Sequence, residues 1–273
     1  MEFGPDLILA ITLLAIAGAT AGLLAGLLGV GGGMVLVPAF FYIFTTLGFE
    51  FDGLMQVCLA TSLATIIVTA LLSVRSHHSH GTVEWTILKR WAIPVGIGAL
   101  LGMLATGALR NDALIIIFAI LALALAAVMG LGVNWKPIRS EMPRGLPRAA
   151  MGLGTGFLST LMGIGGGSIA TPIMLLHGVS IHRAISTAAG FGFLIAVPAV
   201  IGFLAIPTNP MAPPGTIGAV NIPAALAVLA VSVFTTPIGA HLTHRINTQR
   251  LKKVFAIFLA LVALNMMRRA VFG

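Results

Sequence analysis

Charged side chains are scarce in this sequence. Only 8% of its 273 residues are Asp, Glu, Lys or Arg, whereas 58% are hydrophobic. Soluble domains carry about 25% charged residues, so the chain has too little polar surface for a soluble globular protein. Its formal charge is +8, but the basic residues fall between long apolar runs and not on one polar face. This placement excludes a nucleic-acid-binding surface.

Cysteine is nearly absent from the sequence, and known catalytic motifs are missing. Cys58 is the only cysteine, which excludes an internal disulfide and a cysteine cage for a metal. The sequence has no nucleophile elbow, no zinc-binding His-Glu-x-x-His and no phosphate-binding loop. No paired acid and base lie within an apolar run. We therefore expect a protein without enzymatic activity, cofactor or metal, and an intramembrane enzyme is the weakest alternative.

Long apolar runs dominate the sequence instead. A bilayer core about 30 Å thick is spanned by roughly 20 apolar residues, and continuous runs without two-residue alternation favour helices over a membrane β-barrel. These runs predict an all-α polytopic membrane protein with 8 to 10 membrane segments. The segments lie near residues 6–28, 33–49, 54–74, 86–109, 112–134, 147–163, 166–178, 183–206, 219–242 and 251–268.

One glycine-rich motif occurs twice. Gly29-Val-Gly-Gly-Gly-Met-Val-Leu-Val-Pro38 returns as Gly163-Ile-Gly-Gly-Gly-Ser-Ile-Ala-Thr-Pro172. Self-similarity of this kind predicts an internal repeat. We expect two repeats of about five helical segments, residues 1–134 and 148–273, joined by a polar linker at 135–147.

Charge placement predicts that these repeats are inverted relative to each other. Short loops rich in Lys and Arg stay cytoplasmic, and the linker is basic, so we expect it in the cytoplasm. The loop after the second segment carries Glu50 and Asp52 in the first repeat, whereas its counterpart carries His182 and Arg183. Equivalent loops would then lie on opposite sides. Inverted-topology repeats around a midplane site are common among secondary transporters.

The glycine runs are the first candidate site. Glycine destabilises a helix interior by about 1 kcal/mol relative to alanine, so we expect each run to break a helix and to form a Gly-broken helix hairpin. Unpaired N–H groups and the helix dipole at the new start favour an anion. The alternative is close helix packing through small residues. The glycines concerned are Gly31, Gly32, Gly33, Gly165, Gly166 and Gly167.

Small hydroxyl side chains form the second candidate site. They are uncharged donors that suit oxyanion oxygens, and the alternative is a bond back to their own helix. The residues are Thr61, Ser62, Ser168, Ser186 and Thr187. Buried carboxylates, which mark cation pathways, are nearly absent. His182 and Arg183 could capture an anion at the cytoplasmic mouth, or could simply form a basic loop.

Three histidines form the only dense group of metal-ligand type. His77, His78 and His80 are predicted to lie on a loop, without a carboxylate or thiol partner. Imidazole suits several transition metals, so a divalent-metal permease is an alternative. We expect a solvated cytoplasmic turn and no metal.

The stretches GLLGVGGGMVLVP at 26–38, GIGGGSIATPIMLLHGV at 163–179 and HRAISTAAG at 182–190 resemble the sulfite exporter TauE/SafE family of membrane permeases. The resemblance covers nearly the whole chain. It implies transport of small sulfur-containing anions, such as sulfite, sulfonates or sulfoacetate, in the bacterial inner membrane. The glycines and the two hydroxyl pairs would then be permeation residues.

These observations predict a secondary transporter that exposes a midplane anion site to alternate sides of the membrane. A passive anion channel with the same site is the main alternative. The expected partners are a small anionic substrate and the lipid bilayer, and no nucleic acid. A homodimer is compatible with the sequence, which carries no signature of one.

Overall fold

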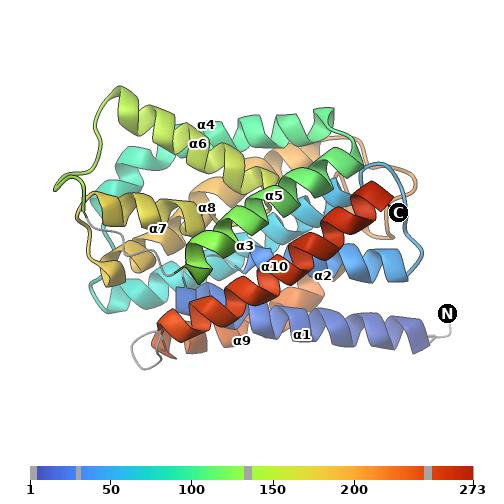
Figure 1. Cartoon of the computed structure of the whole chain (residues 1–273). Helices are drawn as coiled ribbons and strands as arrows, with labels where there is room; N and C mark the ends of the chain where they lie inside the picture. The colour runs from blue at the N-terminus through green and yellow to red at the C-terminus, as the bar shows by residue number, and fades with distance from the viewer. Residues whose placement is uncertain (1–4, 29–31, 132–136, 243–247, 273) are drawn as a thin grey trace.

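The computed structural model describes residues 5–28, 32–131, 137–242 and 248–272, and it is almost entirely helical (Figure 1). Ten helices lie in this described part, so the predicted all-α polytopic membrane fold is confirmed. Both chain ends lie at the same end of the molecule (Figure 1). In chain order the elements are α1 (Pro5–Leu28), α2 (Gly33–Thr46), α3 (Leu54–Ser79), α4 (Trp85–Ala108), α5 (Asn111–Gly130), α6 (Leu146–Leu161), α7 (Gly167–Leu176), α8 (Ile181–Ala205), β1 (Thr216–Ile217), β2 (Val220–Asn221), α9 (Ile222–Leu242) and α10 (Thr248–Phe272).

The polarity of this bundle suits lipid and not water. Seven of the described helices, α1, α3, α4, α5, α8, α9 and α10, are long and apolar enough to cross a membrane. Large apolar side chains face outward, for example Ile93 with 75% of its surface exposed and Phe234 with 72%. Hydroxyl side chains such as Thr65 are buried inside. A soluble protein rarely exposes so much contiguous apolar surface, so the outer face is the lipid-facing one.

Helix breaks at both glycine runs are confirmed. α1 ends at Leu28 and α2 begins at Gly33, while α6 ends at Leu161 and α7 begins at Gly167. The short partners α2 and α7 are apolar but have only 14 and 10 residues. A helix rises 1.5 Å per residue, so neither crosses a bilayer core by itself.

Each broken pair returns to the end from which it started. The amides of Ile138 and Arg139, just before α6, donate hydrogen bonds to the carbonyl of Leu176 at the end of α7. At the opposite end of the molecule, Leu9 near the start of α1 and Thr46 at the end of α2 line one shallow hollow. We name α1–α2 the first hairpin and α6–α7 the second hairpin. Neither hairpin is a full double span.

The two predicted repeats pack against each other throughout the bundle. α1 lies against α9 and α6 against α4, while α3 pairs with α8 and α5 with α10. Glycines allow the closest of these contacts: Gly22 of α1 lies against Ser232 of α9, and Gly156 of α6 lies against Val95 of α4. The contact of α1 with α9 corresponds to that of α6 with α4, as expected for two repeats related by a two-fold axis. The repeat boundaries and the inverted topology stay predictions.

Two local features differ from the expectations. α3 continues to Ser79, so His77 and His78 lie in its last turn and not on a loop. The reason is that no glycine or proline interrupts the chain between Leu54 and Gly81. In addition, residues 216–221 form a two-stranded hairpin before α9, where helix was predicted from 219. Asn221 ends this hairpin and accepts a hydrogen bond from the amide of Ala224, which caps α9.

Candidate functional site

The second glycine run makes a tight turn whose backbone geometry needs glycine twice. Gly163 follows the end of α6 with φ of 61°, its amide bonds to the carbonyl of Thr160, and the amide of Ile164 bonds to that of Ser159. This pair of bonds is a Schellman motif. It satisfies carbonyl groups that the end of a helix leaves open inside the membrane. Gly163 therefore ends α6.

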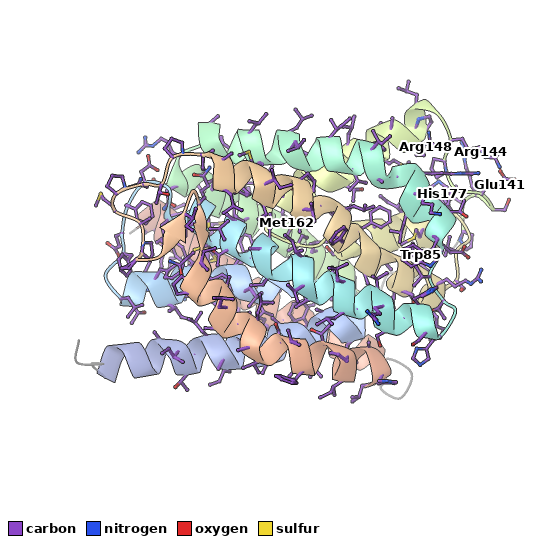
Figure 2. The ribbon with its side chains drawn as sticks, turned by 180° about the vertical axis from the view of Figure 1, so that it is seen from behind. Trp85, Glu141, Arg144, Arg148, Met162 and His177 are labelled. Atoms are coloured by element: carbon purple, nitrogen blue, oxygen red, sulfur yellow. The ribbon has the colours of Figure 1, made fainter. Side chains whose placement is uncertain are left out.

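Gly166 begins the next helix. It is the N-cap of α7 with φ of 72°, and no side chain caps it. Its carbonyl accepts the amides of Ile169 and Ala170, so the amides of Gly167 and Ser168 are the first-turn donors without an intrahelical acceptor. Met162, four residues earlier, lies midway between the ends of the molecule (Figure 2). A helix start with free donors thus lies at mid-depth.

Buried hydroxyls without a hydrogen-bond partner gather around this turn. Ser159 is fully buried, and its Oγ lies 3.2 Å from the position of a Cβ built on Gly166. Ser168 and Thr171, one helical turn apart on α7, are only 9% and 8% exposed. None of the three hydroxyls has a partner among the described residues. Neutral donors of this kind, beside free helix amides, can bind oxygen atoms of an anion.

The first glycine run touches the second. A Cβ on Gly33 would overlap the carbonyl oxygen of Gly163, and the hydroxyl of Ser62 donates a 2.8 Å hydrogen bond to that same oxygen. Gly32 is the N-cap of α2 with φ of 49° and has no side-chain cap. The two breaks therefore meet directly, and Ser62 joins them. The predicted site residue Gly31 lies outside the described residues.

The other predicted glycines line the same turn. Gly165 directs its carbonyl toward α8, where it lies 3.5 Å from the position of a Cβ on Gly192. Gly167 is buried as the first residue of α7. Close packing, the alternative that the sequence left open, is therefore present at these glycines, and substrate binding by them stays a prediction.

Three predicted hydroxyls form hydrogen bonds, two with loops of the opposite repeat and one with a carbonyl of its own helix. Thr61 of α3 accepts the amide of Asn221 at 3.0 Å, and Thr187 of α8 accepts the amide of Glu84 at 2.9 Å. Asn221 precedes α9 and Glu84 precedes α4, so the two bonds have equivalent places in the two repeats. Ser186 donates to the carbonyl of His182 in its own helix at 2.8 Å, which is the alternative that the sequence left open.

The basic pair before α8 is part of the same network. The guanidinium of Arg183 forms an ion pair with the carboxylate of Glu84, and both side chains are partly exposed. His182 is exposed beside it. Anion capture by His182 and Arg183 stays a prediction, and any anion reaching Arg183 competes with Glu84.

The three histidines do not converge on one point. His80 Nδ1 bonds to the carbonyl of Ser76, His78 accepts the indole N–H of Trp85, and His77 is buried. Within the described part of the chain no three His, Cys, Asp or Glu side chains are grouped as metal ligands. Nothing in this geometry favours the divalent-metal alternative.

Sequence reasoning missed two residues of the hydroxyl group, Ser159 and Thr171. A signal existed: each occupies a repeat position that is apolar in the first copy, because Ala25 and Val37 precede them by 134 residues. Their lack of a partner depends on the folded structure. Helix periodicity alone shows no difference between Thr171 and Thr160, whose hydroxyl bonds back to the carbonyl of Gly156.

Comparison with known proteins agrees with this architecture. The model of the family described as "Sulfite exporter TauE/SafE" matches residues 14–266. No solved structure matches the chain at a significant level.

Similar curated proteins are named as transporters. A probable membrane transporter protein of Haemophilus influenzae is 34% identical over 257 residues, which cover 94% of this chain and 97% of that protein. Probable membrane transporter proteins of Methanocaldococcus jannaschii and Bacillus subtilis are 27% and 25% identical, and each alignment covers at least 96% of this chain and 98% of the relative.

Proposed function

The chain belongs to the sulfite exporter TauE/SafE family, and from this premise we propose that it is a secondary transporter of small sulfur-containing anions in the bacterial inner membrane. Sulfite, sulfonates and sulfoacetate are the substrate class. The family and the names of the curated relatives identify a multi-pass membrane transporter. The chemistry of the site supports an anion, and the sulfur-containing class comes from the description of the family.

The observation that carries the proposal is the meeting of two uncapped helix starts at mid-depth. α2 and α7 both begin at a left-handed glycine without a side-chain cap, and their first residues are buried. Donors in this position favour negative charge through the N–H groups and the helix dipole. A cation would need carboxylate or carbonyl oxygens, whereas the unpartnered groups here are hydroxyls.

The absence of charged side chains in the second turn favours release of the bound anion during transport. The stretch from Ser159 to Thr171 contains no Lys, Arg, Asp or Glu, so an anion is held by neutral donors only. Hydroxyl and amide donors bind an oxyanion less tightly than a guanidinium does. A transported ion must leave its site as readily as it occupies it.

Movement of the two hairpins would expose the site to alternate sides. The hairpins open toward opposite ends of the molecule and touch near their turns at Gly33 and Gly163, and Ser62 of α3 bonds to the carbonyl of Gly163. In an inverted-repeat transporter, one half rocks against the other around a fixed site. We propose that the contact between the turns is the pivot of this motion.

Flux measurements on purified protein in liposomes test the function. We expect saturable uptake of radiolabelled sulfite and acceleration of that uptake by unlabelled sulfite inside the vesicles. The second effect is counterflow, which a passive anion channel cannot produce. Current without saturation or counterflow would establish the channel. Absence of any sulfite, sulfonate or sulfoacetate flux would reject the proposed substrate class.

A further inference from the structure

We propose that the side-chain donors for the anion all come from the second hairpin, at one site made by the start of α7 and the hydroxyls of Ser159, Ser168 and Thr171. The first hairpin adds no hydroxyl to this site. This inference rests on the proposed function and deepens it, because the sequence pattern predicted contributions from both glycine runs.

The unpartnered hydroxyls are costly for folding. A buried hydroxyl without a hydrogen-bond partner destabilises a folded protein, because the loss of its bonds to water is not offset. Three such hydroxyls around one helix start are therefore a poor solution for stability. Two others in the described chain, Ser73 on α3 and Ser232 on α9, lie on separate helices outside the hairpins. The concentration in the second hairpin indicates binding.

The hydroxyls also reach the start of α7 from two helices. Ser159 of α6 has its Oγ 3.2 Å from the position of a Cβ built on Gly166, the N-cap of α7, so it lies beside the first turn of that helix. Ser168 and Thr171 differ by three positions and share a face of α7. The donors thus come from both helices of the hairpin. An oxyanion with three sulfur-bound oxygens can accept from all of them at once.

The first hairpin lacks hydroxyls at the matching positions. The repeat spacing of 134 holds in space: Gly32 lies against Ala21, and Gly166 lies close to Thr155. With this spacing, the three hydroxyl positions correspond to apolar residues in the first hairpin. Those residues are Ala25, Met34 and Val37.

The surroundings of the first turn complete the contrast. Val37, the counterpart of Thr171, packs at Gly163, where a Cβ would lie only 2.7 Å from its methyl group. Gly33 and Ser62 contact the carbonyl of Gly163 from the same side. Val37 and Gly33 of the first hairpin therefore meet the second turn without a side-chain donor, and Ser62 of α3 already uses its hydroxyl on the carbonyl of Gly163.

The test separates binding from folding. Ser159→Ala, Ser168→Ala and Thr171→Val each remove an oxygen with little change of shape. Sulfite affinity is measured by titration calorimetry on purified protein, and melting temperature is measured without ligand. We expect one sulfite per wild-type chain. Each variant should bind at least about tenfold more weakly, since each loses one hydrogen bond to a charged ligand. The melting temperature should stay equal or rise.

Ser73→Ala and Ser232→Ala are the matched controls, because they also remove buried unpartnered hydroxyls. Their sulfite affinity should stay within about twofold of wild type. The inference is overturned if the wild type binds sulfite and the three hairpin variants bind equally well, or if they lose binding only together with a lower melting temperature. A wild-type protein that neither binds nor transports sulfite, a sulfonate or sulfoacetate overturns both this inference and the proposed function.

Discussion

Two physical constraints require glycine at the second turn, a positive φ and a lack of space for a side chain. Gly163 and Gly166 both have positive φ, which costs a residue with a side chain about 1–2 kcal/mol. At Gly166 a Cβ would also overlap the Cδ1 of Ile195. The same position therefore combines backbone strain with a steric limit beside the proposed anion site.

Gly166→Ala separates these two effects from each other. We expect it to lower the free energy of unfolding by more than the strain alone, and to reduce sulfite flux, because Ile195 must move. Gly48→Ala is the matched control: Gly48 has φ of 84°, but a Cβ added to it would meet no atom within 4 Å. It should cost only about 1–2 kcal/mol and leave flux unchanged. Equal losses in both variants would show that the space at Gly166 has no importance.

Helix pairs in this bundle depend on small residues at their contacts. In lipid, helices associate through close packing. The acyl chains are as apolar as the helix surfaces, so the hydrophobic effect does not drive helices together. α6 shows this on one face: Gly156 lies against the backbone of Val95, while a Cβ on Gly154 would meet no atom within 4 Å. The two glycines therefore give a matched comparison within one helix.

Gly156→Val should separate α6 from α4, whereas Gly154→Val should be tolerated. The reason is that the first would force a side chain into the backbone of Val95, and the second would place it in open space. Melting temperature and monodispersity in detergent measure the effect. We expect a loss of at least several kcal/mol for Gly156→Val and less than about 1 kcal/mol for Gly154→Val. Similar stability of the two would contradict the packing described for this helix pair.

At the scale of the whole molecule, the loops fall into two groups. Figure 2 places Glu141, Arg144, Arg148 and His177 together at one end, the linker end. At the opposite end, the Asn209 side chain donates to the carbonyl of Asp52. The positive-inside rule predicts that the linker end faces the cytoplasm.

Accessibility labelling tests this orientation. Single cysteines replacing Phe51 and Thr208 should react with an impermeant reagent added outside intact cells, and cysteines replacing Ser140 and Arg183 should react only after permeabilisation. Cys58 is fully buried, and Cys58→Ala provides a background without cysteine. Labelling of positions 51 and 183 from the same side would refute the inverted arrangement.

The linker end also carries a charge that suits anion recruitment. Arg148 lies on the same face of α6 as Thr155 and Ser159, and its buried Nε has no partner among the described residues. Arg144, at the same end, is paired with Glu141 and 74% exposed. Of these two arginines, Arg148 is therefore the one that presents its charge along the second hairpin.

Arg148→Gln should raise the half-saturating sulfite concentration about threefold or more, because positive potential near a site concentrates anions. The effect should shrink at high ionic strength. Arg144→Gln should leave both quantities unchanged. Transport kinetics at low and high salt provide the measurement, and identical behaviour of the two variants would exclude recruitment by Arg148.

The helices were predictable because their causes are local. Apolar runs of membrane length, and glycines costly inside a helix, act within a few residues of chain, so the ten segments and both breaks followed from the sequence alone. The extra turn of α3 that carries His77 and His78 was missed, because apolar length marks the part of a helix within lipid and not its end.

The residues of the candidate site were only partly predictable. Glycine runs and hydroxyl pairs were visible as repeated patterns, but the fate of each hydroxyl depends on atoms brought close from distant parts of the chain. Thr61 meets Asn221 and Thr187 meets Glu84, while Ser159 meets no hydrogen-bond partner in the described part of the chain. A repeat in sequence indicates equivalent places, and it does not show which place has a free donor.

Hydropathy and the conformational cost of glycine within a helix are local properties, and they were enough to predict a helical membrane protein in which two helices break. The hairpins, the contact between their turns and the unpartnered hydroxyls at the second turn became visible only in the folded molecule. Contact and burial arise when separate helices pack, and no local pattern contains that information.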